Sequence, residues 1–183
     1  MKKDLRVIKT DRNIKESFIR LLGRKSFESI TVQNILDEAL INRTTFYNHF
    51  SSKYELAEVI SAELLAKYEQ ALDVRFGDPG NDSDMYARLE MIGRLLSEDS
   101  SKILAMWTVH AESIHLYDDM RIRLEERISL ALKNTATEFQ IQLAVSILMT
   151  MLRHILSDSN TTASKLHDEA VDFFRKNILP RSM

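Results

Sequence analysis

Apolar residues recur along most of this 183-residue chain at intervals of three and four positions, the period of an amphipathic α-helix. Ile14, Phe18 and Leu21 are an example near the start. No segment alternates apolar and polar residues for long, as a half-buried strand would. We therefore expect an all-α fold of about nine helices, over residues 14–22, 32–39, 43–49, 53–76, 85–96, 103–114, 120–131, 137–156 and 166–178.

Polar residues that cap helices stand where several of these segments begin. Thr31 and Asn42 precede the second and third segments, and such side chains accept hydrogen bonds from free backbone N–H groups. Thr137 followed by Gln140 has the spacing of a capping box. Residues 77–82 and 157–162 are rich in Gly, Pro, Asp, Asn, Ser and Thr, and we expect them to separate helices.

The composition supports a helical protein and excludes several kinds of site. The chain has 4 Gly and 2 Pro, which is few for the tight turns of a β-sandwich. It has no Cys, so disulfides, zinc ribbons and thiol catalysis are excluded. The first residues are too polar for a signal peptide, and polar residues interrupt the longest apolar run, 141–156. We expect a cytoplasmic protein with no membrane partner.

The charge is divided unevenly along the chain. Residues 1–55 carry 11 Lys and Arg against 7 Asp and Glu, a net charge of +4, whereas residues 56–183 carry 14 against 20, a net charge of −6. A basic front and an acidic rear fit a small nucleic-acid-binding module attached to another domain. A segment of this length also reaches +4 by chance, so charge alone does not decide the matter.

The three short helices near the N-terminus, with a tight turn between the second and third, predict a helix-turn-helix. In that motif the last helix enters the major groove of DNA. Phe46 and Phe50 lie four residues apart and can both face the core, which leaves other side chains of this helix facing outward. Arg43 and Asn48 are among these, and Arg and Asn can pair bidentately with guanine and adenine.

The same stretch resembles the DNA-binding domain of TetR-type regulators over about residues 10–60. The resemblance rests on a Thr that opens the second helix, an Ala at its end, an aromatic-x-His-Phe group that ends the third, and a Lys and a Leu in the fourth. These positions are Thr31, Ala39, Tyr47-Asn48-His49-Phe50, Lys53 and Leu56. The resemblance implies a DNA-binding domain over residues 1–52 and an effector-binding and dimerisation domain over residues 53–183.

The resemblance also implies roles for single residues. The positions that match phosphate-contacting residues of the family are Thr31, Thr45, Tyr47, His49 and Lys53. Those that match residues able to reach base edges are Gln33, Arg43, Thr44 and Asn48. Two assignments have alternatives, because His49 could instead support helix packing and Gln33 could simply be solvated.

One position departs from the family pattern. Members usually have Gly after the Ala that ends the second helix, whereas this chain has Leu40. A positive φ angle costs Leu far more than Gly. Either Leu40 accepts that strain, or the turn has a different backbone and the recognition helix a different angle.

The segment 137–156 is apolar on nearly every side, and such a helix needs cover all round. The family resemblance implies that it forms a four-helix interface with the last helix and their two-fold mates. A dimer would also place two recognition helices one DNA turn apart on a near-palindromic operator. The alternative is burial in a monomer core. The residues expected in the homodimer interface are Ile141, Ala144, Leu148, Met151, Leu152, Phe173 and Phe174.

The sixth segment supplies candidates for an effector pocket. Trp107, His110 and Ile114 share one face if this segment is helical, and Glu112 lies among them. His115 and Tyr117 follow closely, but His110 and His115 are badly spaced for one metal ion on a helix. We expect neither a metal nor another cofactor here, and ordinary core packing is the alternative for these residues.

No acid–base or nucleophile constellation is present, so we expect no enzyme. The expected function is a transcriptional regulator, a repressor by family habit, released by an unknown small-molecule or protein effector. The alternative is an adaptor or co-activator that keeps the fold and acts through protein contacts. The recognition region is also similar to a short-chain branch of the family that includes an activator from dihydroxyacetone-kinase operons.

Overall fold

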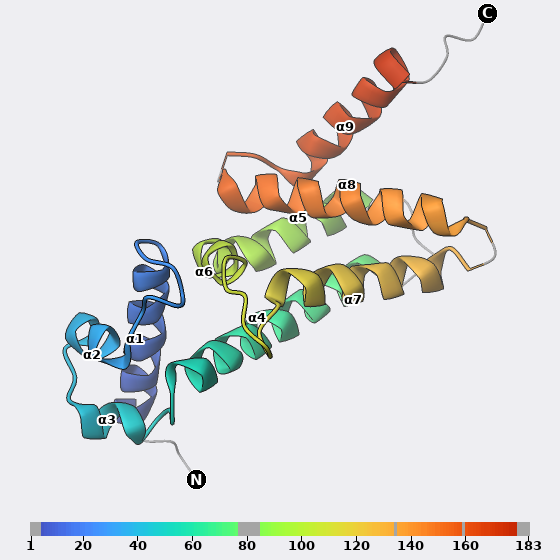
Figure 1. Cartoon of the computed structure of the whole chain (residues 1–183). Helices are drawn as coiled ribbons and strands as arrows, with labels where there is room; N and C mark the ends of the chain where they lie inside the picture. The colour runs from blue at the N-terminus through green and yellow to red at the C-terminus, as the bar shows by residue number, and fades with distance from the viewer. Residues whose placement is uncertain (1–4, 77–84, 134, 159, 179–183) are drawn as a thin grey trace, which may run out of the picture. The chain divides into compact units, whose positions relative to one another are not determined.

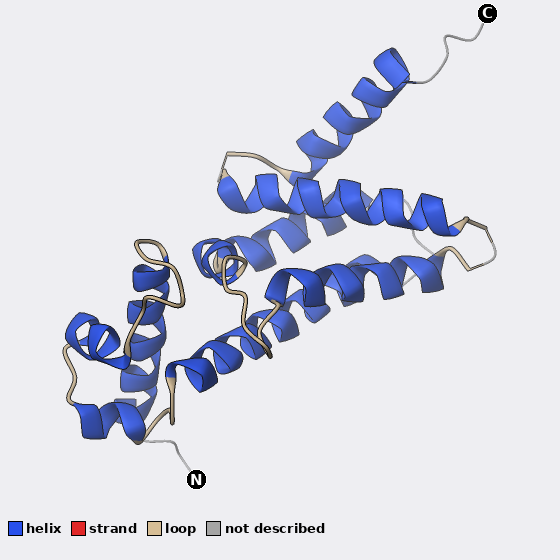
Figure 2. Cartoon of the chain, viewed as in Figure 1, coloured by secondary structure: helices blue, strands red, loops and turns tan. Residues whose placement is uncertain are grey.

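The computed structural model describes residues 5–76, 85–133, 135–158 and 160–178. In these ranges the chain is helical and has no strand, which confirms the expected all-α class (Figure 2). The helices in chain order are α1 (Leu5–Leu22), α2 (Val32–Ala39), α3 (Arg43–Tyr47), α4 (Lys53–Phe76), α5 (Met85–Ser97), α6 (Ser100–Met106), α7 (Leu116–Ala131), α8 (Glu138–Ser157) and α9 (Ala163–Phe173), which continues as the π-helix η2 (Phe174–Ile178) (Figure 1).

The expected caps form. Thr31 accepts a hydrogen bond from the Asn34 N–H, and Thr137 forms a complete capping box with Gln140. Asn42 caps α3 by accepting from the Thr45 N–H at 2.8 Å. These bonds satisfy backbone donors that have no partner inside the helix, and so they fix where each helix begins. The break expected at 77–82 lies outside the described residues.

The sixth helix is shorter than its apolar spacing predicts. We expected it over 103–114, but α6 ends at Met106, and Ala111 and Ile114 instead form an isolated bridge. The Thr108 hydroxyl donates to the Ala105 carbonyl oxygen at 2.7 Å, and β-branched Thr108 and Val109 disfavour a further helical turn. The spacing of Trp107, Ala111 and Ile114 therefore reflects burial in a compact loop.

The chain divides into two compact units. The N-terminal unit comprises Met1–Ala66 and Ser101–Asp119, and the C-terminal unit comprises Lys67–Ser100 and Met120–Met183. The core of the first includes the fully buried Ile14, Phe18 and Phe46. The core of the second is built on α4, α5, α7 and α8, with Leu96, Ile128 and Met149 among its buried residues. Both α4 and α7 contribute residues to each unit.

Candidate nucleic-acid interface

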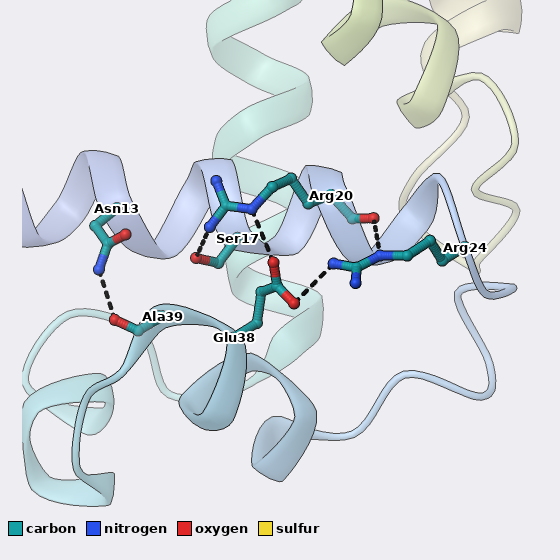
Figure 3. A network of polar contacts seen from close by, with 6 residues as sticks. All are labelled: Asn13, Ser17, Arg20, Arg24, Glu38 and Ala39. Atoms are coloured by element: carbon teal, nitrogen blue, oxygen red, sulfur yellow. Dashed lines mark hydrogen bonds and ion pairs between the residues drawn. The ribbon is translucent and has the colours of Figure 1, made fainter.

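A polar network holds α2 against α1 (Figure 3). Asn13 donates from Nδ2 to the Ala39 carbonyl oxygen at 2.7 Å, at the C-terminal end of α2. Glu38 forms ion pairs with Arg20 at 2.8 Å and with Arg24 at 2.7 Å. Hydrogen bonds from these two guanidinium groups hold the pKa of Glu38 below its ordinary value. The network fixes the direction in which α2 leads into the next turn.

Leu40 adopts the left-handed conformation in the turn between α2 and α3, with φ 54° and ψ 45°. Its N–H donates to the Leu36 carbonyl oxygen, and the Ile41 N–H donates to the same oxygen at 3.1 Å. This is the backbone that Gly usually adopts after a helix, so the turn is kept and the residue accepts the strain. The cost for an L-residue is about 1–2 kcal/mol. The Leu40 side chain is 91% exposed and gains no packing energy in return.

The inward face of α3 is aromatic. Phe46 is fully buried and Phe50 nearly so, with their ring centroids 6.1 Å apart, as the spacing of four predicted. The outward side chains are Arg43, Thr44, Tyr47 and Asn48, all of them exposed. The buried rings therefore set the rotation of α3 and present the polar residues to solvent.

Two of the residues expected to read bases are brought together. Arg43 Nη2 lies 3.4 Å from Gln33 Oε1, and Gln33 Nε2 donates to Asp37 Oδ1 at 2.8 Å. Asp37 was not expected at the site, although its spacing of four from Gln33 on one helix face is a signal that could have found it. Because a carboxylate can only accept, Asp37 turns the Gln33 amide so that its oxygen faces Arg43.

The side chains expected to bind phosphate are placed in different ways. Thr31 is exposed, and its oxygen accepts from Asn34 at 3.2 Å while its own O–H remains able to donate. Tyr47 is 47% exposed and its ring packs edge-on against Phe46. Thr45 is half-buried, next to the Asn42 cap. Thr31 and Tyr47 thus have hydroxyl groups free for an acceptor.

Lys53 has a more constrained position at the start of α4. Its Nζ donates to the carbonyl oxygens of Phe27 (2.8 Å), Glu28 (3.2 Å) and Ile30 (2.8 Å). It also lies 4.6 Å from the centroid of the Phe27 ring. Burial lowers the pKa of Lys53, and the Glu28 carboxylate opposes that effect. An ammonium group has three donors, so a phosphate would have to replace one of these carbonyls.

His49 is half-buried beside Phe50. Its Nδ1 lies 3.9 Å from Asp11 Oδ1, and Asp11 also pairs with Lys15 at 2.8 Å. Burial works to lower the pKa of Lys15, but the hydrogen bonds and charges of Asp11 and Glu63 outweigh it and raise this pKa. The packing and phosphate-binding alternatives for His49 are both compatible with this position.

The capped α2, the left-handed turn and the aromatic-backed α3 define a helix-turn-helix DNA-binding domain. Residues 18–60 match the family model described as bacterial regulatory proteins of the tetR family. This match identifies residues 18–60 as a DNA-binding domain of the TetR type. No curated protein matches the chain at a significant level.

The residues expected around an effector lie in and near the loop that follows α6, and they differ in burial. Trp107 and Ile114 are buried, and Trp107 packs edge-on against Tyr117, with ring centroids 5.1 Å apart. His110 and Glu112, like His115, are exposed to solvent. This loop belongs to the N-terminal unit, where Ser113 donates a hydrogen bond to the Glu58 carboxylate on α4.

The residues expected in a dimer interface fall into two groups. Leu148, Met151 and Leu152 line a cavity inside the C-terminal unit. Ile141, Ala144 and Phe174 are half-buried, and Phe173 is 53% exposed. Exposed apolar residues that the sequence reasoning missed lie on the same two helices, namely Phe139, Leu143 and Val171.

The apolar character of α8 raises the question of whether this helix could span a membrane. Glu138–Ser157 is long and apolar enough to cross a membrane by length and composition, although polar residues interrupt its apolar run. One such helix is weak support for a membrane span, because the helices of folded soluble proteins pass the same test. The capping box at Thr137 and the buried stripe of Val145, Met149 and Leu156 place α8 in a folded unit.

Proposed function

We propose that the chain is a cytoplasmic, homodimeric repressor that binds a near-palindromic operator and is released by an effector. The observation that carries DNA reading is the exposed polar face of α3 on its buried aromatic support. Its role is regulatory rather than enzymatic. The alternative, an adaptor that acts through protein contacts, keeps the same fold and differs in its affinity for DNA.

Specificity is assigned to Gln33, Arg43, Thr44 and Asn48. The supporting contact is the Arg43–Gln33–Asp37 chain, which holds the guanidinium and the amide close together before DNA arrives. Preorganised donors lose less conformational freedom on binding. We assign Asp37 a positioning role in this chain.

The phosphate contacts that position the protein on the DNA are assigned to Thr31, Thr45, Tyr47, His49 and Lys53. Phosphate contacts fix position and orientation but carry no sequence information. Thr31 and Tyr47 support the assignment with their exposed hydroxyl groups. Lys53 would contribute mainly through its charge, because its three donors already bind carbonyl oxygens.

Dimerisation is assigned to the outward faces of α8 and α9. Phe139 is 72% exposed, and Leu143, Val171 and Phe173 are also exposed. Large apolar side chains exposed on two helices of one compact unit support an interaction surface. A two-fold mate would cover them and would place two recognition helices about 34 Å apart.

DNA binding is tested by titrating a labelled DNA fragment from upstream of the gene at several salt concentrations. The logarithm of the affinity should fall linearly with the logarithm of the salt concentration, as phosphate contacts require. Tyr47→Phe should weaken binding to all sequences alike, and Arg94→Ala on α5 serves as the control. Affinity that does not change with salt would favour the adaptor.

The dimer is tested by sedimentation of Phe173→Asp, which places a charge on the exposed apolar face of α9. We expect monomers, because the buried charge would have no partner. Lys165→Asp puts the same charge at an exposed polar position of α9 and should leave the dimer intact. An unchanged sedimentation coefficient for Phe173→Asp would contradict the assigned interface.

A further inference from the structure

A cavity of about 90 Å³ lies within the C-terminal unit. Four helices, α4, α5, α7 and α8, line it together with the first residue of α9. Its walls are almost entirely apolar, and the lining residues are Tyr68, Ala71, Leu72, Arg75, Phe76, Ile92, Leu96, Leu124, Leu148, Met151, Leu152, Ile155 and Ala163. Since apolar cavities exclude water and accept apolar ligands, the walls favour a hydrocarbon group.

Tyr68 brings a polar atom to this lining. The residue is 3% exposed, and burial raises the pKa of its hydroxyl. Among the described residues, no buried side-chain oxygen or nitrogen lacks a hydrogen-bond partner. Buried polar groups are almost always hydrogen-bonded, because leaving one unpaired costs about 1–3 kcal/mol. The cavity therefore contains no unpaired buried group among the described residues, and polar recognition of a ligand rests on the charged residue of the lining.

Arg75 is the one charged residue in the lining. It lies seven residues after Tyr68 on α4, about 10.5 Å further along the helix axis. Its guanidinium lies 5.2 Å from the centroid of the Phe76 ring, and it forms no ion pair with any described residue. Arg75 is half-exposed, so its positive charge lies at the rim of the apolar cavity.

We propose that this cavity binds a small amphipathic carboxylate. The hydrocarbon part lies between α4 and α8, and the carboxylate pairs with Arg75. A sugar or a nucleotide would leave polar groups unpaired against these walls, and a cation would meet Arg75. The inference rests on the proposed function in one respect, because it makes this molecule the effector.

The binding test uses purified full-length protein and isothermal calorimetry with hexanoate, octanoate and decanoate, each compared with the alcohol of equal length. We expect at least one carboxylate to bind at least ten-fold more tightly than its alcohol. Arg75→Gln should remove that preference and leave alcohol binding unchanged. Arg94→Gln is the control, an exposed arginine outside this cavity.

A second variant tests the location. Ala71→Leu should fill the cavity and abolish binding of both carboxylate and alcohol, with helicity monitored by circular dichroism. If Ala71→Leu does not fold, Leu148→Phe from the opposite wall replaces it. Equal affinity for carboxylates and alcohols, or an Arg75→Gln variant that keeps the preference, would overturn the proposal. Binding that survives both filling variants would overturn it too.

A second measurement distinguishes failure of the proposed regulatory function from failure of ligand binding. The same carboxylates are added to the protein–DNA complex, where we expect release of DNA from the wild type but not from Arg75→Gln. Carboxylate binding without release would support the cavity and reject the effector role. Absence of DNA binding in any condition would reject the regulator while the calorimetry still decides the ligand.

Discussion

The stretch from Thr31 to Lys53 and the pair formed by α8 and α9 are both helical, but they are specified differently. In the first, side-chain caps, a left-handed residue and two buried aromatic rings fix each turn. In the second, a capping box opens α8 and Thr162 caps α9, but much of the outward surface is apolar and only partly covered. Local chemistry therefore identifies the first region, whereas the second depends on what binds to it.

The largest expected difference between the regions concerns two phenylalanines. Phe46→Ala should lower the free energy of unfolding by about 3–5 kcal/mol, because it empties a fully buried position. Phe173→Ala removes the same ring from a half-exposed position and should change the stability of the monomer by less than about 1 kcal/mol. Denaturant titration of dilute protein measures both. Similar losses would show that α9 is core rather than interface.

The next effect concerns the DNA-reading chain of residues. Arg43→Ala should cost about 1–3 kcal/mol of discrimination at one base pair. Asp37→Asn should reduce discrimination by less, because the amide can still bind Gln33 but no longer dictates its orientation. Arg153→Ala, an exposed arginine on α8, is the matched control in the other region. Binding to a panel of single-base operator variants gives the ratios, and an unaltered ratio for Arg43→Ala would contradict its role.

A smaller effect is expected at the turn. Leu40→Gly should raise the free energy of unfolding by up to about 1 kcal/mol, since relief of the left-handed strain exceeds the added flexibility of the unfolded chain. Leu40→Ala keeps the strain and should be nearly neutral because the side chain is exposed. Thermal unfolding of the three proteins measures the order. A less stable glycine variant would mean that the exposed Leu side chain makes a stabilising contact.

The smallest effect concerns pH. Because the pKa of Glu38 is held below its ordinary value of 4.5, its ion pairs stabilise the fold above that value. This stability is lost as the pH falls through the lowered pKa. Glu38→Gln should therefore have a lower Tm than the wild type at pH 7, and the difference should shrink toward pH 3. A constant difference across this range would mean that Glu38 acts through packing rather than charge.

Much of the recognition region could be predicted because its determinants are local. Thr31, Asn42 and the Phe46–Phe50 pair act within four residues of themselves, so their spacing encodes their geometry. The end of α6 at Met106 could not be predicted, because the apolar spacing of the following loop imitates a helix. Asp37 was missed because its role depends on how neighbouring side chains orient each other.

The cavity in the C-terminal unit could not be predicted for a different reason. Its lining comes from five helices that are distant in sequence, and apolar residues that line a cavity look the same in sequence as those that fill a core. The expected effector residues followed from the presence of His and Trp in one segment. Trp107 and Ile114 are buried in the loop that follows α6, which is compatible with either core packing or a pocket wall.

The three carbonyl contacts of Lys53 have a mechanical consequence. They bind the first residue of α4 to the segment Phe27–Ile30, which leads directly into the Thr31 cap of α2. The start of α4 is thus connected to the DNA-reading helices not only through the chain but also through these hydrogen bonds. A rotation of the N-terminal end of α4 would therefore be transmitted through these hydrogen bonds to the segment that leads into α2.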